Sequence, residues 1–228
     1  VEGNGQTELV ECITGSRREY TGNIVLQGGS IRNKSIFRIR RGGMSHIPED
    51  RMTQGLAGEA TIEENLIADK MGLASIGWGP VLSGKKIRSG ADRLIEQFRI
   101  KCSSGKQMVS MLSGGNMQKV VVAREVSSKP MVMVANQPTR GVDVGASECI
   151  HEKLVELRDS GKAGFLVSAD LNEAIELSDS LMVLYGGEIV AWFPDASKVD
   201  ERELGYYMLG LKKQSEEEIG GATHEEKK

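Results

Sequence analysis

The feature that most constrains the fold of this chain is a continuous apolar run, MVMVA, at residues 131–135. A strand with one wet face alternates apolar and polar residues, whereas an uninterrupted run indicates a strand buried on both faces of a helix-covered parallel sheet. A second such run, GFLVS at residues 164–168, follows a helical pattern at residues 146–158. This alternation of helices with buried strands predicts an α/β fold.

Further periodic segments extend the alternation. Helices are predicted at residues 7–14, 61–68, 85–98, 116–127, 171–177 and 201–211, and strands at residues 24–27, 44–47, 181–185 and 188–192. Thr61 and Glu64 have the spacing of a capping box, and Gly186-Gly187 between the last two strands indicates a hairpin. Residues 53–109 lack the alternation and are predicted to form a mostly helical insert.

Composition argues against several classes of function. The net charge of −3 gives no positive field for nucleic acid. The three cysteines are far apart and the three histidines have no metal-ligand spacing, so buried thiols in a reducing compartment are expected. A helix that spans a bilayer needs about 20 consecutive apolar residues, and no run in this sequence approaches that length. Membrane association would therefore go through a partner. The tail, residues 212–228, is charged and low in aromatic residues, which predicts disorder.

A glycine-rich loop, VEGNGQT, opens the chain and compares with the phosphate-binding pattern G-x-x-x-x-G-K-[ST]. Gly3 and Gly5 fall where backbone amides would curl around phosphate, and Thr7 falls where a hydroxyl would hold Mg²⁺ at a helix start. Gln6 takes the lysine position and supplies no positive charge. A glycine turn before a helix is also commonly structural. Because this loop starts at the first residue, we expect the natural N-terminus to lie further upstream.

A second motif, LSGGNMQK at residues 112–119, places Ser113, Gly114 and Gly115 at a predicted helix start. Backbone amides and a hydroxyl at such a position can bind an anion. Ser-Gly-Gly alone is equally consistent with an ordinary helix cap. The full octapeptide, however, resembles the signature motif of ABC ATPases, and it follows a helical region as that family requires.

Residues 131–143 resemble the Walker B strand and D-loop of the same family. The family pattern has Asp-Glu after the strand, and here Asn136 and Gln137 stand in those positions. The first carboxylate of the pair would support hydrated Mg²⁺, and the second would polarise the attacking water as a base. Amides keep the shape of these side chains without their basicity.

Two more segments complete the resemblance. Residues 45–51, SHIPEDR, resemble the Q-loop of sugar-type ABC importers, with Glu49 at the glutamine position. Ala169 follows the second buried strand, where the family usually has a switch histidine. The five motifs occur in the family's order, which implies a P-loop NTPase core with a mostly parallel sheet. The ATPase domain would span residues 1–211, with a helical subdomain at about residues 53–127 and its N-terminal strands missing.

The resemblance assigns candidate site residues. No catalytic residue is intact, because Gln6, Asn136, Gln137 and Ala169 are all changed from the family pattern. The residues assigned to the chain's own nucleotide are Gly3, Asn4, Gly5, Gln6, Thr7 and Glu49, with Thr7 as a weak metal ligand. Those assigned to a partner's ATP are Leu112, Ser113, Gly114, Gly115, Asn116 and Gln118, and Asp143 belongs to the D-loop.

Members of this family dimerise head to tail, so each ATP lies between one phosphate loop and the other domain's signature. The resemblance therefore implies the second half of a tandem importer ATPase for simple sugars or nucleosides, with a slight lean toward nucleosides. Its partners would be an N-terminal ATPase half, membrane permease subunits and, indirectly, a substrate-binding protein. ATP and Mg²⁺ would act mainly at the partner's site, on the cytoplasmic face of the membrane. The alternatives are a non-transport ABC ATPase and a purely structural nucleotide-binding module.

Overall fold

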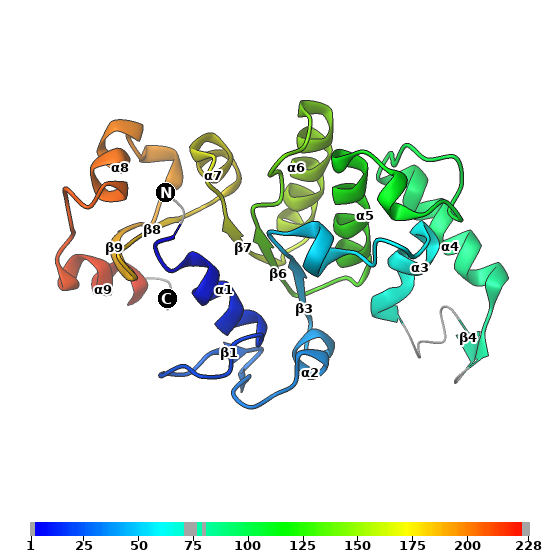
Figure 1. Ribbon diagram of the computed structural model, residues 1–228. Helices are drawn as coiled ribbons and strands as arrows, with labels where there is room; N and C mark the ends of the chain where they lie inside the picture. Colours follow the sequence, from blue (N-terminus) through cyan, green and yellow to red (C-terminus); the bar gives the residue numbers. More distant parts are fainter. Residues whose placement is uncertain (1–2, 71–76, 79–80, 225–228) are drawn as a thin grey trace. The chain divides into compact units, whose positions relative to one another are not determined.

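The computed structural model describes residues 3–70, 77–78 and 81–224 of the 228-residue chain (Figure 1). The chain divides into two compact units, one of residues 1–39 with 166–228 and the other of residues 40–165. The division falls within strand β7 (Ala163–Val167). Among the described residues, no helix is both long and apolar enough to cross a membrane.

The unit of residues 40–165 is built on a three-stranded sheet in the order β3-β6-β7. Strand β3 (Met44–Ile47) runs parallel to β6 (Val132–Asn136), with Met44 opposite Val132 and Ile47 opposite Ala135. Met133, Val134 and Ala135 are at most 3% exposed. The strand predicted from the apolar run is therefore confirmed, and so is the α/β class.

The helices of this unit pack beside the sheet and extend beyond it. They are η1 (Arg51–Gly55), α3 (Ile62–Ile67), η2 (Ala68–Lys70), α4 (Gly84–Gln97), η3 (Val109–Met111), α5 (Gly114–Ser127) and α6 (Val144–Asp159). The short strands β4 (Gly77–Trp78) and β5 (Val81–Leu82) pair antiparallel. The predicted capping box is confirmed, because Thr61 Oγ1 accepts from the Glu64 amide at 3.3 Å while Glu64 Oε2 accepts from the Thr61 amide at 2.8 Å.

A buried ionic cluster joins β3 to α5. The Glu125 side chain is 1% exposed, and it accepts hydrogen bonds from Arg40 Nη2 at 2.7 Å and from Arg124 Nε at 2.8 Å. It also accepts from the backbone amide of His46 at 3.3 Å. Arg124 Nη1 donates to the carbonyl of Gly55 at 2.7 Å. One buried carboxylate thus connects β3, at the start of the Q-loop segment, with α5, which begins in the signature.

The second unit begins with α1 (Gln6–Thr14) and the hairpin of β1 (Val25–Leu26) and β2 (Gly29–Ser30). Most of α2 (Ile36–Arg41) belongs to it as well. Its later elements are α7 (Leu171–Leu177), β8 (Leu181–Tyr185), β9 (Glu188–Phe193), η4 (Ala196–Lys198), α8 (Glu201–Met208) and α9 (Glu216–His224).

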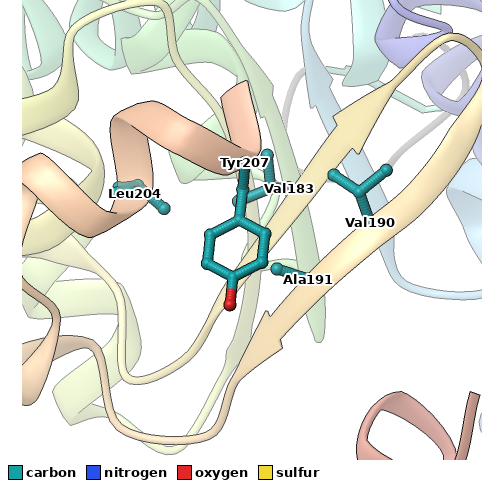
Figure 2. Close-up of a cluster of buried hydrophobic side chains, with 5 residues drawn as sticks. All are labelled: Val183, Val190, Ala191, Leu204 and Tyr207. Atoms are coloured by element: carbon teal, nitrogen blue, oxygen red, sulfur yellow. The ribbon is translucent and has the colours of Figure 1, made fainter. Parts of the chain in front are cut away.

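The β8–β9 hairpin predicted from Gly186-Gly187 is confirmed, and both glycines have positive φ. Figure 2 shows the small core that α8 makes with this hairpin. It consists of Val183, Val190, Ala191, Leu204 and Tyr207. The Tyr207 ring also meets the ring of Phe193 edge-on, with 5.6 Å between ring centroids.

The prediction of a disordered tail is wrong for residues 216–224, which form α9. The reason is a local cap that composition does not reveal. Ser215 Oγ accepts from the Glu218 amide at 3.2 Å, and Glu218 Oε2 accepts from the Ser215 amide at 2.7 Å. Gln214 just before it bonds to β9 through the Val190 carbonyl at 2.9 Å.

Two predicted elements are shorter than expected. Strand β1 covers only residues 25–26, because Gln27 has a positive φ of 49° and turns the chain. Helix α8 ends at Met208, and Gly210 beyond it adopts a left-handed φ of 70°.

Candidate functional site

The phosphate loop is a glycine turn at the start of α1. Gly3 and Gly5 have φ of 85° and 103°, the left-handed region that glycine enters at little cost. Gly5 caps α1 without a side-chain hydrogen bond, so no side chain covers the helix start at the capping position. Backbone amides at such a helix start can bind phosphate.

Asn4 attaches this loop to the β8–β9 turn. Asn4 Oδ1 accepts from the Gly186 amide at 2.9 Å, and the Asn4 carbonyl accepts from the Gly187 amide at 3.1 Å. A Cβ on Gly5 would lie 3.3 Å from the Gly187 Cα, so the close approach favours glycine. Sequence reasoning missed this link, since the Gly186-Gly187 pair indicated a hairpin but no contact with residue 4.

Gln6, at the lysine position, bends back over the loop. Its Oε1 atom accepts a hydrogen bond from the Asn4 amide at 3.0 Å. A lysine could not accept this bond, since an ammonium group only donates. The substitution therefore removes a positive charge from the loop and adds an internal hydrogen bond.

Asn136 and Gln137, the pair at the Walker B-like positions, lie at the end of β6. Asn136 is 5% exposed at the last position of the strand, and Gln137 has a positive φ of 51°. Gln118 is 2% exposed, and its Nε2 atom donates to the carbonyl of Pro138 at 2.7 Å. Gln118 therefore differs from the expectation that it faces a partner's ATP, because its side chain is turned inward to hold the turn after Gln137.

The signature forms the N-terminus of α5. Ser113 is exposed and caps the helix, accepting from the Asn116 amide at 3.5 Å and from Asn116 Nδ2 at 2.9 Å. Asn116 Oδ1 in turn accepts from the Lys101 amide at 2.8 Å. These bonds set the direction of the helix start and leave Ser113 on the surface.

Close packing explains why glycines follow Ser113. A Cβ on Gly115 would lie 2.8 Å from Asp143 Oδ2 and 2.9 Å from the Ala146 Cβ. Asp143 caps α6, with Oδ1 accepting from the Ala146 amide at 2.9 Å. The D-loop aspartate therefore holds the start of α6 directly beside the start of α5.

The Q-loop segment contacts the D-loop through two arginines. Arg140 Nη1 forms an ion pair with Glu49 Oε1. Arg51 Nη1 donates to the Arg140 carbonyl at 2.8 Å, and Nη2 donates to the Gly141 carbonyl at 3.4 Å. Sequence reasoning assigned Glu49 to a nucleotide and gave no role to Arg51, whose partners lie about 90 positions away in sequence.

Asp50, within the Q-loop segment, caps the start of η1. Its carboxylate accepts from the Thr53 hydroxyl at 2.7 Å and from the Met52 amide at 2.8 Å. The bond from the Thr53 hydroxyl, with those from the backbone, lowers the pKa of the Asp50 carboxyl below its ordinary value. Asp50 therefore stays ionised and keeps the η1 start capped.

The sequence-predicted residues fall in both units. Residues 40–165 bring together Glu49, the signature at Leu112–Gln118, the pair Asn136 and Gln137, and Asp143. Gly3 to Thr7 and Ala169 belong to the other unit, and Val1 and Glu2 of the motif lie outside the described residues. Ala169 lies between β7 and α7 and has no ring nitrogen with which to contact a phosphate.

The chain's own donors suit phosphate better than Mg²⁺. Among the described residues no three His, Cys, Asp or Glu side chains form a metal-binding group. Asn136 is a neutral amide, whereas Mg²⁺ prefers carboxylates. The amides of Gly3, Gly5 and Thr7 suit the phosphates of a nucleotide.

His46, on β3 and within the Q-loop segment, is a buried base. Its Nε2 atom is buried without a hydrogen-bond partner among the described residues. Burial lowers the pKa of His46 from its ordinary 6.5 to about 4, although the Glu125 charge opposes the shift. The ring is therefore neutral at pH 7.

We expect this histidine to make stability depend on pH. Because the folded-state pKa is the lower one, the unfolded chain binds the proton first as the pH falls. The stabilisation is complete above about pH 6.5 and is lost between there and about pH 4. Between about pH 7.5 and about pH 5, the free energy of unfolding of the parent protein should fall by about 2 kcal/mol more than that of the His46→Leu variant. Urea denaturation of both proteins at each pH measures the difference. Parallel pH profiles for the two proteins would contradict this prediction.

A phosphate loop at a helix start, a buried strand ending in an Asn-Gln-Pro-Thr turn and a Ser-Gly-Gly helix cap together define an ATP-binding cassette. Residues 1–140 match the family model described as ABC transporter, and the chain belongs to this family.

Curated relatives name what related proteins do. The chain is 39% identical over 213 residues to the guanosine import ATP-binding protein NupO of Bacillus subtilis, covering 92% of this chain and 41% of that protein. It is 38% identical over 210 residues to the nucleoside import ATP-binding protein NupA of Lactococcus lactis, covering 92% and 41%. The chain thus spans less than half the length of these relatives.

Solved structures show the same fold. An ATP-binding cassette of an ABC transporter superposes with a TM-score of 0.74 at 21% identity, over 92% of this chain and 83% of that one. A dimeric cassette bound to ADP and Pi superposes with a TM-score of 0.71 at 22% identity, over 84% and 81%. The α/β cassette fold predicted from the motifs is therefore confirmed.

Proposed function

We propose that this chain is the ATP-binding part of an importer for nucleosides or simple sugars and that it works as half of an asymmetric pair. The names of the relatives support import, and the nucleoside and guanosine importers among them favour nucleosides. The ATPase domain would span residues 1–211, with a helical subdomain at about 53–127. It would act at the cytoplasmic face of the membrane with permease subunits and, indirectly, a substrate-binding protein.

The observation that carries the proposal is the confinement of the losses to one of two sites. Gln6, Asn136, Gln137 and Ala169 would all act on the nucleotide at this chain's own loop. The signature keeps its serine, both glycines and the capping bonds of Ser113. The chain would therefore hydrolyse little of its own ATP and would complete the site of an N-terminal ATPase half.

The residues of the phosphate loop and of the signature would bind two different nucleotides. Amides at Gly3, Gly5 and Thr7 would bind phosphate on this chain, without a lysine to neutralise charge. Ser113, Gly114 and Gly115 would present a hydroxyl and amides to a nucleotide on the partner, where developing negative charge is stabilised by such donors. ATP with Mg²⁺ would supply the phosphoryl chemistry at the partner's site.

Restoring the lost groups should add a second working site. In the complete ATPase, the combined variant Gln6→Lys, Asn136→Asp, Gln137→Glu and Ala169→His is expected to raise ATP turnover up to about twofold, because base, lysine and switch groups return together. Phosphate release under saturating ATP measures this.

The matched control is Gln97→Glu, which makes an amide acidic on the exposed surface of α4, away from the motifs. It should leave turnover unchanged. Equal turnover in parent and combined variant, together with full activity after Ser113→Arg, would show that the asymmetric assignment is wrong.

A further inference from the structure

Two arginines cross between the segment of residues 49–51 and the D-loop. The Arg140 side chain reaches to Glu49, while the Arg51 side chain reaches back to the carbonyls of Arg140 and Gly141. Each segment thus contributes one guanidinium group to the other. Guanidinium hydrogen bonds are stronger than neutral ones, and their fork geometry fits two acceptors at once.

The same arginine lies against the signature. A Cβ on Gly114 would lie 2.9 Å from Arg51 Nη2 and 3.3 Å from the Gly141 carbonyl oxygen. Arg51 is therefore within contact range of both the D-loop backbone and the first turn of α5. The three segments meet around one guanidinium group.

Two further hydrogen bonds connect α5 to the turn before the D-loop and to the end of η1. Gln118 Nε2 donates to the Pro138 carbonyl at 2.7 Å, which connects α5 to the turn before the D-loop. Arg124 Nη1 donates to the Gly55 carbonyl at 2.7 Å, which connects α5 to the end of η1. Between these anchors, the crossed arginines add direct contacts between residues 49–51, the D-loop and the start of α5.

We propose that Arg51 and Arg140 are positioning residues that hold the signature and the D-loop, residues 139–143, as one body. Neither side chain is required to touch ATP in this role. The inference rests on the proposed function, because it assigns importance to where Ser113 is presented. A shift of residues 49–51 would then move the D-loop and Ser113 together.

The test compares Arg51→Ala, Arg51→Lys and Arg140→Ala in the full-length ATPase that carries this chain. Arg158→Ala is the control, since Arg158 forms an ion pair with Asp159 at 3.0 Å and is 40% exposed. Amide hydrogen exchange of residues 113–116 and 139–143 is measured alongside kcat and KM for ATP.

In Arg51→Ala and Arg140→Ala, exchange in both segments should rise about tenfold, because charge-assisted bonds that close the segments are lost. The value of kcat should fall about tenfold while KM stays within about twofold, since a misplaced donor costs transition-state binding. Arg51→Lys keeps a positive charge and its donors but loses the guanidinium fork, so it should restore part of both values, and Arg158→Ala should change neither.

Unchanged exchange in both segments would overturn the proposal, and so would faster exchange with unchanged kcat. If Arg51→Ala does not fold, the same criteria apply to Arg51→Lys and Arg140→Ala. Ser113→Arg distinguishes a failure of the proposed function from a failure of the positioning role. Activity that survives Ser113→Arg refutes the proposed function, whereas loss of activity there with no effect of the arginine variants refutes only the positioning role.

Discussion

Replacing Ser113 with arginine should reduce ATP hydrolysis by the complete ATPase about a hundredfold or more, a loss typical for one donor that stabilises transition-state charge. Ser113 is exposed at the start of α5, and its hydroxyl is positioned by Asn116. In the proposed arrangement, an arginine side chain would fill the space in which a partner's nucleotide would approach the amides of Gly114 and Gly115. Steady-state phosphate release measures the effect.

The control for this variant is Ser110→Arg, which adds the same side chain three residues earlier on the exposed η3 turn. It should retain normal hydrolysis, because Ser110 is outside the signature. Ser113→Ala removes the helix cap without adding a bulky side chain, and the lost cap is expected to cost about 1 kcal/mol of stability. Comparing it with Ser113→Arg separates the effect of the lost cap from steric exclusion of the nucleotide. Normal hydrolysis in Ser113→Arg would rule out a role for this signature in ATP turnover.

Replacing Glu125 with alanine should lower the free energy of unfolding by about 3–5 kcal/mol, because breaking a buried ion pair leaves its partners uncompensated. Arg40 Nη2, Arg124 Nε and the His46 amide would each lose the acceptor they now share. The Glu125 side chain is 1% exposed, so water cannot easily replace it. Denaturant titration of the purified protein measures the change.

Glu156→Ala is the matched control, because Glu156 pairs with Lys153 but is 60% exposed. Exposed ion pairs contribute little, so its unfolding midpoint should hardly move. A Glu125→Ala protein as stable as the parent would mean that the cluster does not hold β3 against α5. Glu125→Gln keeps two polar atoms but no charge, so its free energy of unfolding should lie between those of Glu125→Ala and Glu156→Ala.

Much of the fold followed from local sequence patterns. The run at residues 131–135 predicted a buried strand because two-sided burial selects unbroken apolar sequence, and β6 confirms it. Thr61 with Glu64 and the Gly186-Gly187 pair also act within a few residues, so their predictions were confirmed. Helix α9 was missed because composition was weighed above the cap formed by Ser215 and Glu218.

The site was less predictable because its contacts join distant positions. The bond of Arg51 to the Arg140 carbonyl spans 89 positions, and the bond of Gly186 to Asn4 spans 182. Neither pair carries a motif that would indicate the other. Gln118 lies within the signature, yet its inward bond to Pro138 depends on how α5 packs beside the D-loop.

We propose that ATP turnover depends on this chain's signature and not on its own phosphate loop. The most direct test is phosphate release by the complete ATPase after the phosphate loop of the other half has been disabled. We predict hydrolysis at less than about a tenth of the unmodified rate, because in the proposed assignment Gln6, Asn136, Gln137 and Ala169 supply neither a base nor a lysine to this chain's own nucleotide. Hydrolysis that persists at more than about a tenth of the unmodified rate, a difference of about 1.4 kcal/mol in barrier, would contradict it.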